Sequence, residues 1–402
     1  MTLFNTWASM LSLVRNASLP LESNNVSHRP FLSDVNDVVA FTLTLPENSS
    51  TPRRDAWRRI WEWERLVDPH WLQQEPLPYA MHVCIGVVVF FVAAFAIVGN
   101  VLVLWSIVRF RSLRTSSNLF IISLAVADII MSVIDFPLFA VSSFLGYWSF
   151  GYNMCQMYTI STGAAGLVNI NTLAAISYDR YTVVVRRVLP VHHVSRSMTR
   201  LVIAVIWISS VLWMMFPMMG WGHFTLEGTG TSCTFDYLDR SAANRAYVTT
   251  LTLANFVVPL IVIVFSYVRI FLSVSAVRRG LMDNWPEFSL QSQRQGRKLH
   301  TELKMAVTTL VIVGVFCVSW TPYVIVATIA LFGDAHLVTP MTSAVPCLLA
   351  KVATVSNPPL YSLGHPKFRK KIRLLVMSAM NRNPNVSMSS FTVSMDHPPT
   401  TL

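Results

Sequence analysis

The chain has 402 residues, of which 53% are hydrophobic and 13% are charged, and its mean hydropathy is +0.49. Soluble domains carry about 25% charged residues, so this composition excludes an ordinary soluble enzyme and indicates a membrane protein. The formal net charge of +11 does not indicate nucleic-acid binding, because the lysines and arginines lie between apolar runs, where membrane orientation accounts for them.

Residues 1–80 form a polar leader that we expect to be extracellular, glycosylated and largely irregular. It lacks the basic and apolar regions of a cleavable signal peptide, so we expect the first span to target the chain. Three Asn-X-Ser sequences, at Asn16, Asn25 and Asn48, are candidate glycosylation sites. Residues 53–65 are either a helix that lies on the membrane surface or a solvated, partly ordered segment.

Seven apolar runs follow, each near or above the length that crosses a bilayer as a helix. Only helices and closed barrels span lipid, and the linkers are short. The sequence therefore predicts an all-α membrane protein, with a bundle of seven transmembrane helices over residues 81–364. The runs cover residues 82–108, 118–145, 152–185, 201–221, 247–274, 303–332 and 337–363.

Basic residues predict the orientation of the bundle. Arginine and lysine are concentrated in the first, third and fifth linkers and after the last run, whereas the alternate linkers hold Glu227, Asp236, Asp239 and Asp334. The positive-inside rule then places the N-terminus outside the cell membrane and the C-terminus in the cytoplasm.

Two segments follow the seventh run. Residues 365–378 repeat apolar side chains among basic ones, which predicts a short amphipathic helix against cytoplasmic lipid. Residues 379–402 are rich in serine and threonine, and we expect a disordered tail. That tail is either a phosphorylation switch or remains unmodified.

Lys351 lies in the middle of the last apolar run, near the expected midplane of the bilayer. A charged amine there costs at least about 2.5–3.5 kcal/mol. An ionisable residue inside the membrane indicates a functional site, although one half of a structural ion pair is the alternative. Cys84, Cys317 and Cys347 also fall within apolar runs, and we interpret them as small core residues.

Short motifs occur once per run and in a fixed order. Together they resemble the rhodopsin-like G-protein-coupled receptors over roughly residues 80–375. The motif residues are Asn100, Asp128, the triplet Asp179, Arg180 and Tyr181, then Trp207, Pro259, Trp320 with Pro322, and Asn357, Pro358 and Tyr361.

Lys351 sharpens the resemblance to the opsins, in which the retinal-binding lysine lies six residues before the asparagine of the last motif, here Asn357. The resemblance implies covalently bound retinal, as the 11-cis or all-trans isomer. An amine desolvated in an apolar pocket has a lowered pKa and can attack an aldehyde as the free base. The product Schiff base must be protonated to absorb visible light, which requires a nearby anion.

The anion is expected on a loop. Many vertebrate visual opsins use a glutamate three residues after the first cysteine of the third span, and this chain has Tyr158 there. The second outer loop, residues 220–233, resembles the opsin loop that folds as a lid over the retinal pocket. Glu227, six residues before Cys233 in this loop, is at the counterion position of invertebrate-type and bistable opsins. Asp135 is a second candidate, which either shares the counterion role or bonds to backbone near the kink expected at Pro137. The resemblance also implies a disulfide between Cys155 and Cys233.

The same resemblance implies further roles. Trp320, Tyr323, Tyr158 and Phe216 are candidate walls of a retinal pocket, and ordinary core packing is the alternative for each. Glu302 is expected to pair with Arg180 and to close the inactive state. The activation switch would comprise Asp179, Arg180, Tyr181, Glu302, Asn357, Pro358, Tyr361, His365, Pro366 and Lys367.

The triplet His365, Pro366 and Lys367 resembles that of Gq-coupled invertebrate visual pigments and melanopsins. We therefore expect a bistable light sensor coupled to Gq, with Go or Gs as alternatives, and with arrestin and a receptor kinase acting on the tail. Competing interpretations are a retinal photoisomerase of the peropsin type and a receptor for a diffusible ligand. We expect neither a catalytic site nor a metal site.

Overall fold

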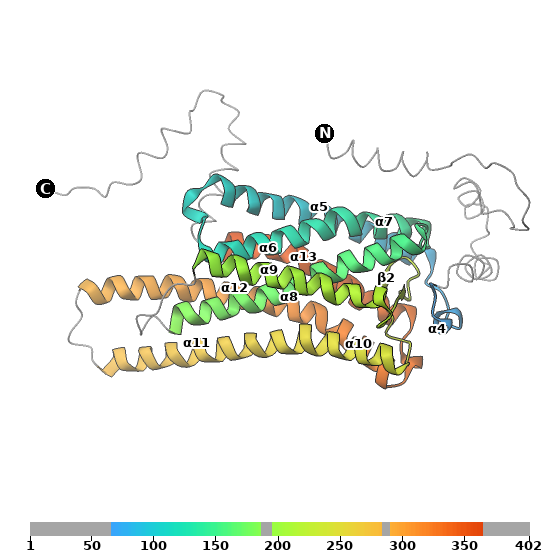
Figure 1. Cartoon of the computed structure of the whole chain (residues 1–402). Coiled ribbons are helices and arrows are strands. Elements are labelled where there is room, and N and C mark those ends of the chain that lie inside the picture. Colours follow the sequence, from blue (N-terminus) through green and yellow to red (C-terminus); the bar gives the residue numbers. More distant parts are fainter. Residues whose placement is uncertain (1–65, 186–194, 284–289, 365–402) are drawn as a thin grey trace, which may run out of the picture. The chain divides into compact units, whose positions relative to one another are not determined.

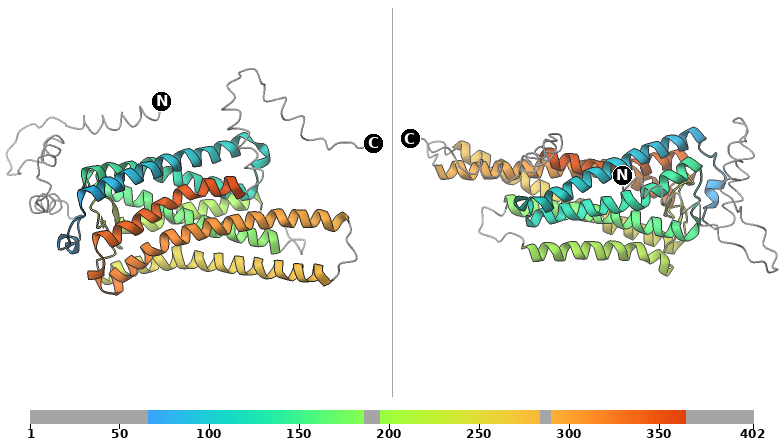
Figure 2. Two further views of the ribbon diagram at one scale, coloured as in Figure 1. Left: turned by 180° about the vertical axis from the view of Figure 1, so that it is seen from behind. Right: turned by 90° about the horizontal axis from the view of Figure 1, so that it is seen from above.

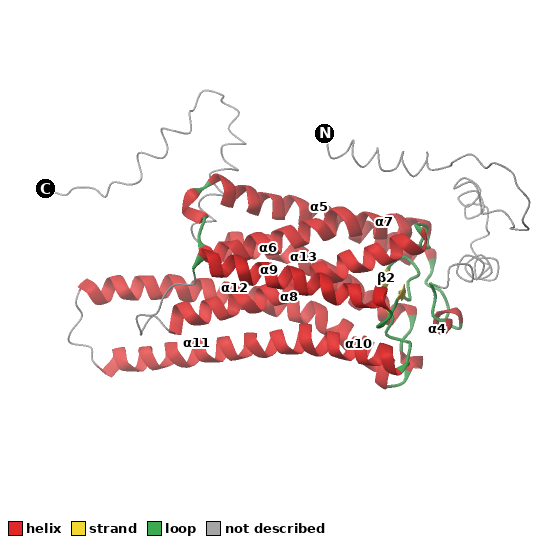
Figure 3. Cartoon of the chain, in the orientation of Figure 1, coloured by secondary structure: helices red, strands yellow, loops and turns green. Residues whose placement is uncertain are grey.

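The computed structural model describes the backbone of residues 66–185, 195–283 and 290–364, and the side chains of residues 66–185, 195–276 and 303–358. The predicted sequons, the amphipathic helix at 365–378 and the tail at 379–402 lie outside these ranges. Long helices run side by side through almost all of the described chain, and two short strands lie at one end (Figures 1 and 3).

Seven helical segments form the predicted transmembrane bundle, and two of them change helix type on the way. The first, third, fourth, sixth and seventh segments are α5 (Tyr79–Arg109), α8 (Gly151–Val185), α9 (Arg196–Met215), α12 (Leu290–Phe332) and α13 (Pro340–Gly364). The second segment is α6 (Ser116–Ile130) and α7 (Phe136–Leu145), and the fifth is α10 (Ala242–Thr252) and α11 (Val258–Asp283). Within the described residues, six of the seven are long and apolar enough to cross a membrane by composition, and α13 completes the bundle.

Local sequence explains where several helices begin. The hydroxyls of Thr115, Ser195 and Ser241 accept hydrogen bonds from backbone N–H groups in the first turns of α6, α9 and α10, at 3.3, 3.2 and 3.3 Å. These bonds satisfy donors that a helix start leaves unpaired. At the other end of the second segment, Gly146 has a φ of 80°, the left-handed conformation in which glycine ends helices without strain.

The two changes of helix type both precede a proline. A π-helical turn spans Met131–Asp135 just before Pro137, and another spans Leu253–Val257 just before Pro259. Proline lacks a backbone N–H and its ring clashes with the preceding turn, so wider turns accommodate it. The first turn ends at Asp135 and fixes the direction in which this side chain leaves the helix.

The helix α8 is central in the bundle and packs against α6, α9, α11 and α12, while α13 lies between α5 and α12 (Figure 2). Between these helices lies an apolar core that includes Leu124, Leu173, Ile312 and Phe316. The outward faces are also apolar, as in Val318, whose exposed fraction is 74%. Apolar side chains on both the inner and outer faces are typical of helices surrounded by lipid.

A lid covers one end of the bundle. Its strands β1 (Phe224–Leu226) and β2 (Cys233–Phe235) pair antiparallel, with Leu226 opposite Cys233. The backbone carbonyl of Leu66 accepts hydrogen bonds from the Leu226 N–H and the Thr225 hydroxyl, both at 2.7 Å. Residues 66–72, within the range predicted as an irregular leader, thus form an ordered layer on the lid that includes the short helix α4 (Pro69–Leu72).

Candidate ligand pocket

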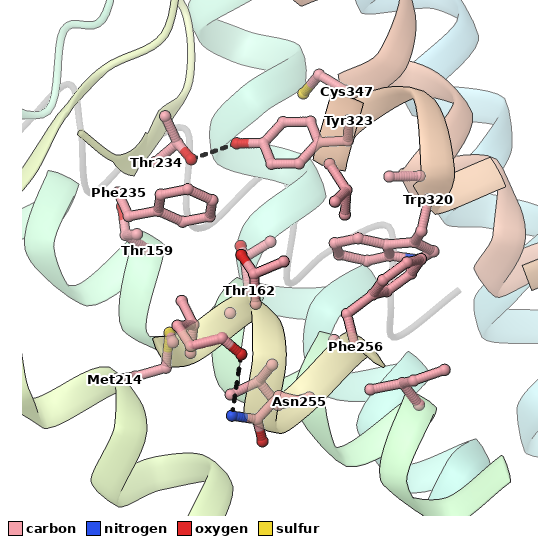
Figure 4. Close-up of a pocket in the computed structure, with 18 of the residues that line it drawn as sticks. Thr159, Thr162, Met214, Thr234, Phe235, Asn255, Phe256, Trp320, Tyr323 and Cys347 are labelled. Atoms are coloured by element: carbon pink, nitrogen blue, oxygen red, sulfur yellow. Dashed lines mark hydrogen bonds between the residues drawn. The ribbon is translucent and has the colours of Figure 1, made fainter. Parts of the chain in front are cut away.

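A cavity of about 130 Å³ lies between the lid and the third, fifth, sixth and seventh helical segments (Figure 4). Most of its wall is apolar or aromatic. These wall residues are Met131, Leu167, Ile170, Met214, Phe235, Leu251, Phe256, Phe316, Trp320, Tyr323, Val324 and Ala350. The few polar side chains include Thr159, Thr162, Asn255, Glu227 and Lys351. An apolar cavity with few polar groups is the common form of a small-molecule site.

Lys351 reaches this cavity from α13, and only 8% of its surface is exposed. Its Nζ atom donates a hydrogen bond of 2.9 Å to the Cys347 thiol, one helical turn earlier. The same atom lies 4.8 Å from the centroid of the Phe139 ring on α7. The amine is therefore held in a dry environment by a soft acceptor and an aromatic face.

Glu227 lies on the lid, lines the cavity and is 2% exposed. Its Oε2 atom accepts a hydrogen bond of 2.8 Å from the Ser232 hydroxyl, and its backbone N–H donates to the Ser232 carbonyl at 2.9 Å. The Oε1 atom is buried without a hydrogen-bond partner among the described residues. Because buried polar atoms are nearly always paired, this oxygen is an acceptor available to a ligand or a water.

The predicted disulfide between Cys155 and Cys233 is present and fixes the lid to α8, with a Cα–Cα distance of 5.6 Å. Cys233 is in β2, and Glu227 follows directly after the partner strand β1. The disulfide and the strand pairing together hold the Glu227 carboxylate above the cavity.

Asp135 is fully buried, and its Oδ2 atom accepts a hydrogen bond of 3.2 Å from the Ser161 hydroxyl on α8. The expected alternative was a bond to backbone near Pro137, and the partner found is a side chain of another helix. The Oδ1 atom is unpartnered among the described residues. Phe139, which contacts the Lys351 amine, lies one turn after Asp135 and on the same helical face. Neither Asp135 nor Glu227 forms a direct ion pair with Lys351 among the described residues.

The four predicted wall residues divide into two groups. Trp320 and Tyr323 line the cavity, and the Tyr323 hydroxyl bonds with that of Thr234 on the lid (Figure 4). Tyr158 and Phe216 are absent from the described residues that form the lining. Tyr158 is buried, and its ring packs edge to face against that of Trp148 at a centroid distance of 5.3 Å.

Phe216 belongs instead to an aromatic cluster at the end of the fourth segment. Its ring centroid lies 5.4 Å from that of Trp213 and 5.2 Å from that of Trp221. Packing of these rings against one another explains how Phe216 is accommodated outside the cavity lining.

Among the lining positions that were not singled out in the sequence, two bear directly on Lys351 and Trp320. Cys347 was interpreted as a core residue, but its position one turn before Lys351 could have indicated a contact. Gly166 on α8 lets Trp320 approach, because a Cβ atom there would lie 2.9 Å from the Trp320 ring. No local pattern marks that glycine, since its role depends on another helix.

The cytoplasmic motifs are only partly within the described side chains. The Asp179 carboxylate accepts hydrogen bonds from the Ser117 hydroxyl at 2.7 Å and from Arg180 at 2.5 Å. Glu302 lies in α12 and Tyr361 in α13, but their side chains are outside the described set, as is the triplet 365–367. The pairing of Arg180 with Glu302 therefore stays a prediction.

Comparison with known proteins agrees with this architecture. The model of the family "7 transmembrane receptor (rhodopsin family)" matches residues 99–361. The "Rhodopsin, GQ-coupled" of Mizuhopecten yessoensis is 38% identical over 354 residues, which are 87% of this chain and 68% of that protein. The melanopsin of Mus musculus is 35% identical over 322 residues, 78% of this chain and 62% of that protein.

The crystal structure of squid rhodopsin superposes with a TM-score of 0.74 at 32% sequence identity, covering 83% of this chain and 97% of the squid chain. A family match over more than half of the chain, and relatives at this identity, agree with the seven-helix bundle. The chain belongs to the rhodopsin family of seven-transmembrane receptors, and within that family it is an opsin.

Proposed function

We propose that this opsin is a light-sensing receptor that binds retinal covalently at Lys351 and activates a heterotrimeric G protein. The observation that carries the proposal is the position of the Lys351 amine, which lies in an apolar cavity inside the helical bundle. Such a buried amine is costly unless it is used.

The residues of the cavity fit this chromophore. Retinal is a polyene aldehyde, so its chain requires apolar walls and its aldehyde requires an amine. Trp320, Phe235 and Phe256 supply aromatic walls (Figure 4). Lys351 lines the same cavity and supplies the amine. When bound, retinal supplies a chromophore that absorbs visible light and changes shape.

Glu227 is the proposed main counterion of the resulting cationic linkage. A buried cation needs a nearby anion, and the unpartnered Glu227 Oε1 atom is an acceptor in the same cavity. Asp135 shares the role in this proposal, since its Oδ1 atom is also unpartnered and its helical face turns toward the amine. The Tyr158 hydroxyl is likewise buried without a hydrogen-bond partner among the described residues.

Transmission to the cytoplasm is proposed to begin at Trp320. Its ring stacks on Phe316 at a centroid distance of 5.6 Å and closely approaches Gly166. Pro322, two residues later, weakens the hydrogen bonding of α12 at this level. A displaced Trp320 would therefore swing the cytoplasmic half of α12 outward and separate Glu302 from Arg180. The groove that opens would receive a helix of the G protein.

Gq is the favoured partner, and Go and Gs are the alternatives. The name of the Mizuhopecten relative states Gq coupling, and the triplet 365–367 resembles that of such pigments. Arrestin and a receptor kinase are proposed partners of the serine- and threonine-rich tail.

Absorption spectra of the purified protein test this function. The protein is regenerated with 11-cis retinal and, separately, with all-trans retinal, and spectra are recorded before and after illumination. We expect a visible band with 11-cis retinal that shifts on illumination, and none in Lys351→Ala. No band with either isomer would contradict an opsin pigment. A band only with all-trans retinal, converted by light to released 11-cis retinal, would favour the photoisomerase.

Two substitutions distinguish the contributions of Glu227 and Asp135 to the counterion. Glu227→Gln should shift the absorption maximum and move the loss of the visible band at alkaline pH to a lower pH, because the cationic linkage loses its main anion. Asp135→Asn should produce a smaller change in the same direction. An unchanged absorption maximum and an unchanged alkaline titration in Asp135→Asn would exclude Asp135 from the counterion.

A further inference from the structure

We propose that Cys347 is a positioning residue that couples the Lys351 amine to the Glu227 carboxylate. The inference deepens the proposed function and rests on it for the bound state, but the contacts themselves belong to the retinal-free protein. It assigns a purpose to a thiol that core packing alone does not explain.

The first contact is between Cys347 and Lys351. The sulfur accepts the 2.9 Å hydrogen bond from Nζ, and both residues lie on the same face of α13. Cys347 is 3% exposed and lines the cavity. Since both side chains leave the same rigid helix one turn apart, the thiol limits the positions that the amine can adopt.

The second link is between Cys347 and Glu227, which line the same cavity. The Glu227 Oε1 atom is buried and has no hydrogen-bond partner among the described residues. A thiol is both a weak acceptor and a weak donor. Its sulfur can therefore accept from Nζ while its S–H group turns toward this oxygen.

The arrangement explains how the Glu227 carboxylate on the lid can act as counterion for the Lys351 amine on α13 without a direct ion pair. Among the described residues, Lys351 and Glu227 make no salt bridge; Lys351 donates to the thiol, and the thiol and Glu227 line the same cavity. Removing the thiol would leave the buried Lys351 amine without the hydrogen-bond acceptor that it has among the described residues. Serine preserves a donor and an acceptor at this place, whereas alanine preserves neither.

The test in retinal-free protein is thiol labelling. In full-length Cys84→Ala/Cys317→Ala protein, Cys347 is the one free thiol, because the other two cysteines form the disulfide. The rate of modification by methyl methanethiosulfonate follows the thiolate fraction. We expect Lys351→Gln to slow labelling about tenfold or more and Glu227→Gln to accelerate it, because an adjacent cation favours and an adjacent anion disfavours the thiolate. Equal rates in all three proteins would overturn the proposal.

Cys317 supplies the matched control. It is half-buried on α12 and absent from the cavity lining formed by described residues. In a Cys84→Ala/Cys347→Ala background, the labelling rate of Cys317 should be the same with and without Lys351→Gln. A rate that changes equally at both cysteines would indicate altered reagent access and would overturn the electrostatic coupling.

A spectroscopic measurement requires no substitution of a charged residue. The S–H stretching band of Cys347 is recorded by infrared difference between the Cys84→Ala/Cys317→Ala protein and the same protein with Cys347→Ala. A band shifted to low frequency, as for a thiol that donates to a carboxylate, supports the proposal. A band at the frequency of a free thiol contradicts it.

Titration of the regenerated pigment distinguishes a failure of the Cys347 inference from a failure of the proposed function. In regenerated protein, the visible band of Cys347→Ala should disappear at a lower pH than that of wild type, where the proton concentration is about tenfold higher. The reason is that the Glu227 carboxylate is less well held near the cationic linkage. Cys347→Ser should restore wild-type behaviour. If wild type forms a pigment and Cys347→Ala titrates identically, the inference fails and the function stands. If wild type forms no pigment, the function fails, and labelling and infrared spectra still decide the inference.

Discussion

The side-chain amide of Asn357 on α13 donates a hydrogen bond of 2.9 Å to the Asp128 carboxylate on α6, deep in the bundle. Asn169 on α8 donates to the other carboxylate oxygen at 2.8 Å. One buried carboxylate thus joins three helices below the cavity. Movement of α13 relative to α6 must break or re-form this contact, which places it on the path from the cavity to the cytoplasm.

Asn357→Ala should destabilise the inactive bundle. It leaves one oxygen of a fully buried carboxylate without its donor, at a cost of about 1–3 kcal/mol. The thermal midpoint of the detergent-solubilised protein should fall. Thr328→Ala is the control, because its exposed hydroxyl bonds only to a carbonyl of its own helix. Equal midpoints for Asn357→Ala and Thr328→Ala would show that the buried contact is not needed for stability.

Loss of the disulfide should release the lid. Cys155 and Cys233 are 78 residues apart, and removing a bond that closes so long a loop costs about 2–5 kcal/mol. Cys233→Ser should lower the thermal midpoint and also the yield of pigment, because Glu227 is held through the same hairpin. Cys84→Ser removes an exposed free thiol and should leave both unchanged. A normal pigment yield in Cys233→Ser would show that the disulfide is not needed to hold Glu227 in place.

Gly166→Ala should raise receptor activity in the dark. The added methyl would lie 2.9 Å from the Trp320 ring and must displace it, which imitates the proposed first step of activation. Nucleotide exchange on purified Gq, measured in darkness, is the readout. Gly314→Ala on α12 meets no atom within 4 Å and serves as the control. If Gly166→Ala is no more active in the dark than Gly314→Ala, displacement of Trp320 does not activate the receptor.

The lid should be more stable in mildly acidic solution than in alkaline solution. The His223 ring nitrogen lies 2.9 Å from the Asp236 carboxylate, and this hydrogen bond raises the pKa of His223 above its ordinary 6.5. Partial burial lowers this pKa, whereas the negative charges of Asp236, Asp239 and Asp68 raise it further. The protonated form therefore stabilises the folded lid. The contribution is complete below the ordinary pKa and is lost as the pH rises through the raised one.

The measurement is the thermal midpoint of the pigment from mildly acidic to mildly alkaline pH, in wild type and in His223→Gln. The wild-type midpoint should fall with rising pH, and the substitution should flatten that fall. Identical pH profiles would show that another group titrates.

Residue spacing within single helices predicted much of the architecture. Seven apolar runs predicted the bundle, and the cysteine positions, through the resemblance to opsins, predicted the disulfide. Lys351 and Glu227, assigned from spacing to a nearby asparagine and cysteine, both line one cavity. The bundle and the disulfide are confirmed, because helix geometry and family motifs determine them locally. The chromophore role of Lys351 and the counterion role of Glu227 stay predictions.

Contacts between elements distant in sequence were not predictable in the same way. The direction of Asp135 depends on a π-helical turn, and the approach of Trp320 depends on Gly166 across two helices. Phe216 was expected at the cavity but packs with tryptophans instead, since burial in either place satisfies an aromatic ring. The layer of residues 66–72 on the lid rests on backbone hydrogen bonds that no side-chain pattern signals.

Chemical trapping of the retinal linkage identifies the lysine that carries the chromophore. The pigment is formed with 11-cis retinal in the dark, reduced with sodium borohydride, digested and analysed by mass spectrometry. We expect one retinyl adduct, on the peptide that contains Lys351, and no adduct in Lys351→Ala. A pigment whose reduced adduct maps to another lysine, or an adduct that persists in Lys351→Ala, would contradict it.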